Sequence, residues 1–151
     1  YFGNKIEVNF LIMCYNLKEG ALRKCKVNIN SSIGGSENSV CAEGYLEASG
    51  DNFIVVYALD GDRCTLSYCD NTAEQIRVGG QNVKITFKEG EKTFCEIGSG
   101  DFRGGFEVYT KSLKVISGKG GVKLTLEYFS GADGEKNALS FVAAYTEQEK
   151  K

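Results

Sequence analysis

Four segments of the chain alternate between apolar and polar residues with a period of two. They are residues 6–12, 83–87, 122–128 and 139–145. Successive side chains of a β-strand point to opposite faces, so this period predicts strands with one buried face. Residues 53–59 are continuously apolar and rich in β-branched side chains, which predicts a strand buried on both faces.

Shorter apolar runs and paired glycines complete the pattern. Residues 26–29, 106–109 and 113–116 predict further strands, whereas helix is only weakly indicated, at residues 16–23 and 71–77. Many short strands separated by regular turn signals are typical of a β-sandwich or a β-barrel. The glycine pairs expected to form turns are Gly34-Gly35, Gly79-Gly80, Gly104-Gly105 and Gly120-Gly121.

The length and composition fit one domain, or one domain plus an extension, with enough apolar residues for a hydrophobic core. The chain has 151 residues, of which 42% are hydrophobic. Its net charge of −2, with acids and bases interspersed, gives no electrostatic reason to expect a nucleic-acid partner. It has no run of about 18 apolar residues, so we expect no membrane-spanning helix. The polar end, residues 147–151, is expected to be a frayed tail.

The cysteine count constrains the compartment. Six cysteines in a chain of this size favour three disulfides and an oxidising environment, and hence a secreted, extracellular protein. A zinc site is the alternative, but the tightest pair, Cys64 and Cys69, is separated by four residues and histidine is absent. Asn30 begins an N-glycosylation sequon, which agrees with secretion. The six residues are Cys14, Cys25, Cys41, Cys64, Cys69 and Cys95.

A catalytic site is hard to assemble from this sequence. The chain contains no histidine, which excludes a Ser-His-Asp triad, a Cys-His pair and a histidine-liganded metal. The carboxylates Glu89 and Glu91 lie among lysines and a glycine, a composition typical of a solvated hairpin tip. We therefore predict that the protein is not an enzyme and uses no obligatory cofactor.

Two acidic turns are candidates for calcium binding. Asp60 and Asp62 flank Gly61, and a second turn contains Asp133 and Glu135 around Gly134. Calcium takes six to eight oxygen ligands from such loops. The spacing of an EF-hand is missing, and a β-turn, in which aspartate and glycine are favoured, is the preferred explanation of both segments.

From Cys41 onward the chain carries an ordered set of features. They are Cys41, Leu46, Gly50 and Cys64, then a strand with Val83, Ile85 and Phe87, then Cys95, then residues 122–128 before Ser130 and Asp133, and finally a strand with Phe141, Ala143 and Tyr145. In this order they resemble a CUB domain, which has an early cysteine pair with a leucine and a glycine, a V-x-L-x-F strand, a third cysteine, a late strand before a Ser-Asp loop, and a closing aromatic strand.

The chain departs from the CUB pattern in its cysteines. The family's fourth cysteine, expected between Cys95 and Ser117, is missing, Cys69 is extra, and Leu66 stands where the family has an aromatic residue. The resemblance implies an antiparallel β-sandwich of jelly-roll type over residues 41–146. Residues 1–40 are then an N-terminal extension, packed on the sandwich or continuous with it.

The resemblance also implies particular pairings and ligands. It implies a Cys41–Cys64 disulfide, and proximity in the sequence then favours Cys14–Cys25 and Cys69–Cys95, although sequence alone leaves the connectivity open. Some CUB domains hold calcium at one end of a sheet, and the nearest counterparts of those ligands here are Asp101 and Asp133.

The function predicted from these observations is recognition. CUB domains are extracellular modules that bind proteins or glycans, so we expect a secreted, non-catalytic module with a protein or glycan partner. A structural or matrix-forming role is the alternative, and the sequence does not decide between a monomer and a homo-oligomer. The side chains proposed as binding anchors, in or near predicted turns, are Tyr45, Tyr68, Phe102 and Arg103.

Overall fold

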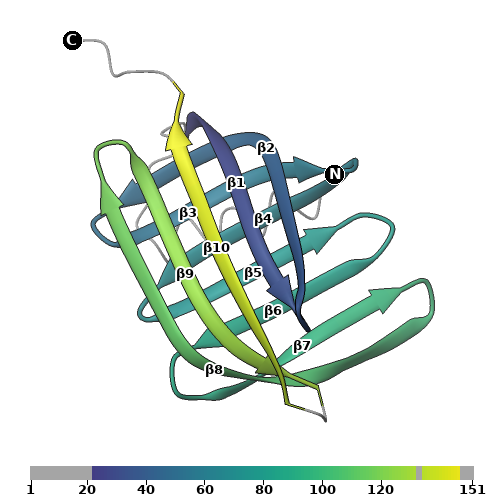
Figure 1. Ribbon diagram of the computed structural model, residues 1–151. Helices are drawn as coiled ribbons and strands as arrows, with labels where there is room; N and C mark the ends of the chain where they lie inside the picture. Colours follow the sequence, from purple (N-terminus) through teal and green to yellow (C-terminus); the bar gives the residue numbers. More distant parts are fainter. Residues whose placement is uncertain (1–21, 132–133, 147–151) are drawn as a thin grey trace.

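The protein folds as one antiparallel β-sheet that closes into a barrel (Figure 1). The computed structural model describes residues 22–131 and 134–146. Its strands are β1 (Arg23–Ile33), β2 (Ser36–Ser49), β3 (Asn52–Leu59), β4 (Asp62–Cys69), β5 (Thr72–Val78), β6 (Asn82–Lys88), β7 (Lys92–Ser99), β8 (Phe102–Gly118), β9 (Gly121–Ser130) and β10 (Glu135–Tyr145).

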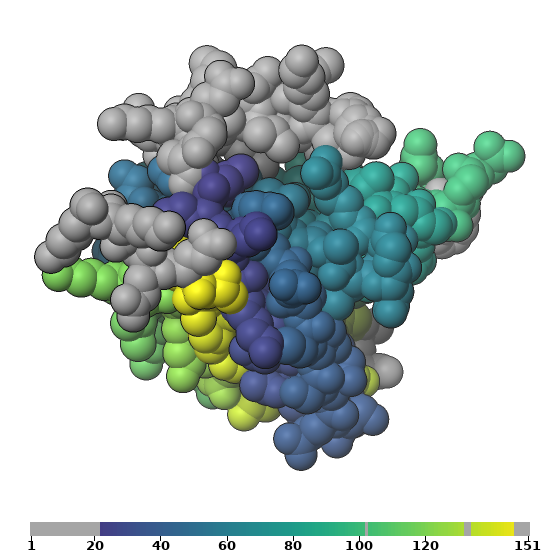
Figure 2. Space-filling model, turned by 90° about the horizontal axis from the view of Figure 1, so that it is seen from above, coloured from purple at the N-terminus to yellow at the C-terminus, as the bar shows by residue number. Residues whose placement is uncertain are grey.

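Closure comes from the pairing of the first described strand with the last. Every other strand pairs with its neighbours in sequence, and β1 pairs with both β2 and β10. In the β1–β10 ladder, Cys25 lies opposite Tyr145 and Ile33 opposite Asn137. Figure 2 shows β10 in yellow, β1 in purple and β2 in blue side by side. No described strand is therefore left with an unpaired edge.

The core is the lumen of the barrel. Because alternate side chains of a strand point to the same face, each strand contributes every second residue to the interior. On β9 these are Val122, Leu124 and Leu126, all buried, and on β10 Phe141 and Ala143 are fully buried. A strand with this pattern reads as alternating apolar and polar, which is how residues 122–128 and 139–145 were predicted as strands.

A polar contact between β3 and β5 lies inside this apolar interior. The Tyr57 ring packs against the Phe141 ring, with centroids 5.6 Å apart. The side-chain amide of Gln75 donates a hydrogen bond to the Tyr57 hydroxyl oxygen at 3.1 Å. Burial raises the pKa of Tyr57 well above its ordinary value, so the phenol stays neutral and available for this bond.

The turn between β6 and β7 is tied to the middle of β8. The backbone of Gly90 donates to the Thr110 carbonyl at 2.8 Å, next to a bulge between Thr110 and Ser112. The Glu89 carboxylate accepts a hydrogen bond from the Leu113 amide at 2.8 Å. Glu89 is exposed, as predicted for a hairpin tip, but its carboxylate also satisfies a backbone donor at the bulge.

The predicted sandwich is wrong, because a single sheet closes on itself instead of two sheets packing face to face. Residues 23–40, expected to be packed on the sandwich or continuous with it, form β1 and the start of β2 and so belong to that same sheet. The weak helix signal at residues 71–77 is also wrong, since these residues lie in β5 and its preceding turn. Gly104 and Gly105 lie within β8 and do not form a turn.

The predicted disulfides are wrong wherever the structure describes both partners. Cys41 and Cys64 are both free thiols, with Cys41 exposed on the outer face of β2 and Cys64 buried inside the barrel. Side chains on opposite faces of a sheet cannot meet the short Cβ separation that a disulfide needs. Cys95 is a free thiol directed into the lumen, whereas the alternation of β4 places Cys69 on the outer side.

Cys25 is likewise a free, buried thiol, and Cys14 lies outside the described residues. The buried cysteines therefore act as small apolar core residues. Burial raises the pKa of the Cys25 thiol to about 11, so it is protonated and unreactive at neutral pH.

Secretion and glycosylation at Asn30 lose the support that the disulfide prediction gave them. The predicted strand at residues 6–12 and the tail at residues 147–151 also lie outside the described residues.

Replacing Phe141 with alanine is expected to lower the free energy of unfolding by about 3–5 kcal/mol, because a fully buried ring leaves a cavity in the lumen. Chemical denaturation of the purified chain measures this. Ile116, whose side chain is 69% exposed on β8, is the matched control, and its change to alanine should alter stability by less than about 0.5 kcal/mol. Equal losses at the two positions would contradict the placement of the core.

Thiol labelling should separate the exposed cysteine from the buried ones. At neutral pH a thiol reagent is expected to modify Cys41 in the folded chain, and Cys25, Cys64 and Cys95 only after unfolding, because buried thiols are both shielded and protonated. Mass spectrometry of the labelled peptides gives the readout. A disulfide-linked peptide that joins Cys41 to Cys64 in an unreduced sample would show the free-thiol assignment to be wrong.

Candidate functional site

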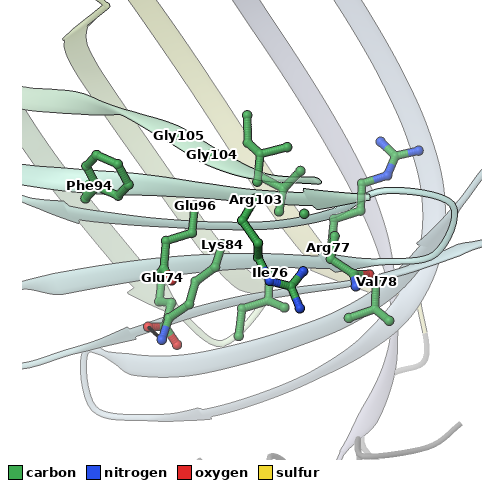
Figure 3. A pocket seen from close by; sticks show the side chains of 14 residues that line it. Glu74, Ile76, Arg77, Val78, Lys84, Phe94, Glu96, Arg103, Gly104 and Gly105 are labelled. Carbon is green, nitrogen blue, oxygen red and sulfur yellow. Dashed lines mark ion pairs between the residues drawn. The ribbon is translucent and has the colours of Figure 1, made fainter. Parts of the chain in front are cut away.

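A groove lies on the outer face of the barrel, across β5, β6, β7 and β8. We call it the outer groove, and its volume is about 960 Å³. That volume lies at the upper end of the range typical of ligand sites, which is roughly 300–1,000 Å³. Figure 3 shows its side chains from close by.

Alternation along the strands explains which side chains reach the outer groove. Ile85 and Cys95 are buried in the lumen, so their neighbours Lys84 and Glu96 point outward. Lys84 lies directly opposite both Ile76 on β5 and Glu96 on β7. One cross-strand row therefore presents an apolar, a basic and an acidic side chain side by side.

The charges of the outer groove are balanced. The Lys84 ammonium lies 3.7 Å from a carboxylate oxygen of Glu74, and both side chains remain partly exposed. Glu96 and Arg103 add one charge of each sign at the other side of the groove. An exposed ion pair of this kind contributes little to folding, typically about 0.2–1 kcal/mol, so these charges remain available for contacts with a ligand.

Glycines form the floor of the outer groove next to an exposed aromatic ring. Gly98, Gly104 and Gly105 line it without side chains, and the Phe94 ring is 51% exposed. A Cβ atom added at Gly105 would lie 2.6 Å from the Phe94 ring and 2.0 Å from the Cys95 carbonyl oxygen. Only glycine at position 105 therefore allows Phe94 to lie over the strand.

Arg77 reaches the opposite side of the sheet. In Figure 3 its side chain points away from those of Glu74, Ile76 and Lys84. Its Nε donates to a carboxylate oxygen of Asp62 at 2.7 Å, and this hydrogen bond raises the pKa of the guanidinium. The Asp62–Arg77 ion pair thus links the start of β4 to β5 on the face of the sheet opposite the outer groove.

The structure places the predicted binding anchors in different settings. Arg103 lines the outer groove, and Tyr45 is exposed on β2, away from it. Tyr68 points inward, stacks on Phe53 with centroids 6.1 Å apart, and donates its hydroxyl to Asn71 at 3.3 Å. The side chain of Phe102 lies outside the described set. These four residues do not form one cluster.

The predicted calcium ligands are not gathered by the described structure. Asp62 is paired with Arg77, Asp60 is in a turn with a positive φ of 51°, and Asp101 is exposed in the β7–β8 turn. Asp133 lies outside the described residues. Within residues 22–131 and 134–146 no three carboxylate or cysteine side chains are grouped as they would be around a metal ion.

Across those same ranges, no helix has the length and hydrophobicity to cross a bilayer.

Most of the outer groove was missed by sequence reasoning. Phe94, Lys84 and Glu96 lie inside strands, where they read as ordinary outward-facing positions, and only the register of four strands brings them together. The one local signal was the glycine pair at 104–105, which stands between apolar runs but forms no turn. A glycine inside a strand marks a bulge or a close approach of another group.

No family model and no curated protein matches the chain. Among solved structures it resembles the crystal structure of the ywiB protein from Bacillus subtilis. The two chains share 12% sequence identity, with a TM-score of 0.71, and the match covers 84% of this chain and 96% of the other. At this identity the likeness concerns the fold alone.

Changing Gly105 to alanine is expected to destabilise the protein by about 1–3 kcal/mol, because the added methyl group would overlap the Cys95 carbonyl oxygen and the Phe94 ring. Thermal unfolding followed by circular dichroism measures the loss. Gly118 is the matched control, since it also lies in β8 and an added Cβ would meet nothing within 4 Å. Equal stability of the two variants would remove the steric account of the groove floor.

Proposed function

We propose that this chain is a non-catalytic recognition protein that binds a segment of another protein in the outer groove. The single observation that carries the proposal is the groove itself, which is large and places an exposed aromatic ring among balanced charges. Protein-binding surfaces combine an aromatic or arginine anchor with a polar rim in this way. Phe94 is the proposed anchor, and Arg103 and Lys84 belong to the rim.

The shape of the groove favours an extended segment. It runs across four neighbouring strands, which lie about 4.8 Å apart, so it is roughly 15 Å wide from β5 to β8. An extended chain covers about 3.3 Å per residue, so four or five residues of a ligand would fit across it. Charges of both signs in the groove can pair with either sign of side chain on such a segment.

The non-catalytic part of the proposal rests on the sequence. Without histidine the chain lacks the most common general base and the partner that activates most serine and cysteine nucleophiles. A matrix-forming role has less support, because the described strands offer no unpaired edge to which another copy could add a strand.

Changing Phe94 to alanine is expected to weaken ligand binding by tenfold or more, a loss of about 1.4 kcal/mol or greater, without unfolding the protein. A displayed library of random peptides, selected on the intact chain, supplies the ligands, and calorimetry measures their affinity. Tyr45→Ala is the matched control, since this aromatic ring is 47% exposed on a different part of the barrel.

Two results would overturn the proposal. One is a library that yields no enriched peptide, or peptides that bind the Phe94→Ala variant as tightly as the original chain. The other concerns the non-catalytic part, which falls if the pure protein turns over a substrate and loses that activity when one acid or serine is changed.

A further inference from the structure

A second exposed surface lies on the outer side of β8 and β9, and it is basic and aromatic. We call it the β8–β9 face and define it by Tyr109, Phe129, Lys111, Lys114 and Lys123. Tyr109 and Phe129 lie opposite each other on the two strands and stack with their centroids 6.3 Å apart, and 39% of the Tyr109 surface is exposed. All three lysines are exposed, and among the described residues none of them makes an ion pair.

This concentration of positive charge is local. The whole chain has a net charge of −2, so a surface with three unpaired lysines is set apart from the rest of the sequence. Of the two acids on these strands, Glu127 of β9 is engaged by Lys136 of β10 at 3.8 Å, and Glu107 of β8 is exposed without an ion pair among the described residues. Three lysines against these two acids leave the face with a positive balance. The outer groove, by contrast, has balanced charges. The β8–β9 face therefore suits a ligand that carries negative charge.

A shallow groove of about 400 Å³ continues from this face across β10, β1 and β2. Its side chains follow one cross-strand row in which Thr125 lies opposite Ser140, Ser140 opposite Asn30, and Asn30 opposite Ser39. Lys114 of the β8–β9 face lies opposite Thr125, so the row begins at the basic surface. Glu37, which lies opposite Ser32, also lines this groove and is its one acidic side chain in the described part of the chain. The negative charges of a ligand would therefore lie at the lysine end, and its neutral hydroxyls along the row.

The polar groups of this row can still bind a ligand. Ser39 donates its hydroxyl to the Asn30 side-chain oxygen at 2.7 Å, which leaves the Asn30 amide hydrogens to donate outward. Hydroxyl groups both donate and accept hydrogen bonds, as the hydroxyls of a sugar do. Within the described residues the side chains of Thr125 and Ser140 make no hydrogen bond, so both remain available.

We propose that the β8–β9 face and this adjoining groove bind an acidic polysaccharide. The apolar face of a sugar ring stacks on the exposed Tyr109 ring, whose π face is supported from the other side by Phe129. The carboxylates or sulfates of the polysaccharide pair with Lys114 and Lys123. Its neutral hydroxyls exchange hydrogen bonds with the side chains of Thr125, Ser140 and Asn30.

A polysaccharide fits this surface better than nucleic acid does. A nucleic-acid chain needs cationic contacts along its length, because every nucleotide carries a phosphate. Here the lysines occupy one end of the surface, and the remaining row is made of neutral hydroxyl and amide groups. The site is separate from the outer groove, so this proposal does not rest on the protein-binding function.

The test measures binding of the full chain to four immobilised polymers at about 50 mM salt, where charge screening is weak. Heparin and polygalacturonate present sulfates and carboxylates respectively, dextran is a neutral polysaccharide, and single-stranded DNA is a polyanion without a polysaccharide backbone. We expect measurable binding to heparin, polygalacturonate or both, and much weaker binding to dextran and DNA. If heparin binds more tightly, the surface prefers sulfate groups, and if polygalacturonate binds more tightly, it prefers carboxylates.

Two variants assign the binding to this surface. The double change Lys114→Gln and Lys123→Gln, and separately Tyr109→Ala, are each expected to reduce the affinity by about tenfold or more. The matched control combines Lys24→Gln with Tyr45→Ala, which removes an exposed lysine and an exposed tyrosine from neighbouring strands elsewhere on the barrel. Circular dichroism confirms that each variant is folded.

Four outcomes would overturn the proposal. They are no binding to either acidic polysaccharide, equal binding to dextran, tighter binding to DNA than to both polysaccharides, and full affinity retained by Tyr109→Ala. The last would show charge attraction without recognition of a sugar ring. Loss of polysaccharide binding in these variants with unchanged peptide binding in the outer groove would confirm that the two sites are independent.

Discussion

Pairing of β1 with both β2 and β10 is the interaction on which the rest of the structure depends. It satisfies the backbone groups that would otherwise form two sheet edges, and it turns one face of every strand into a common interior. Once the sheet is closed, apolar side chains such as Leu124 and Phe141 leave water by pointing inward. Most polar side chains are left on the outside, so the two proposed binding surfaces are outer faces of the sheet.

The strands were more predictable than their closure. Period-two alternation is local, and it located residues 122–128 and 139–145 as strands because each has one apolar face. The same alternation occurs in sandwiches and barrels, since both bury one face. The difference lies in contacts such as Cys25 opposite Tyr145, which are far apart in sequence and follow from no local pattern. A likeness to CUB domains supplied the wrong choice.

The cysteine prediction failed for a different reason. An even count and the absence of metal-ligand spacing are statements about compartment and chemistry, and neither carries information about geometry. In the barrel, Cys64 and Cys95 occupy positions where small apolar side chains fit the interior, and Cys41 faces outward. The binding anchors show the same limit. Arg103, predicted because it lies beside a glycine pair, lines the outer groove, and Phe94, which also lines it, was not predicted because it lies inside a strand.

A closed barrel can carry two proposed binding surfaces on different parts of its outer face. The outer groove uses β5 to β8, and the basic and aromatic surface uses β8 onward, so β8 is the strand that they share. The bulge between Thr110 and Ser112 divides this long strand into two parts, and Glu89 fixes it through the Leu113 amide. β7 pairs only with the part before the bulge, up to Tyr109, whereas β9 pairs with residues on both sides of the bulge, from Val108 to Gly118. The two proposed surfaces therefore meet at Val108 and Tyr109, where β8 pairs with β7 on one side and with β9 on the other.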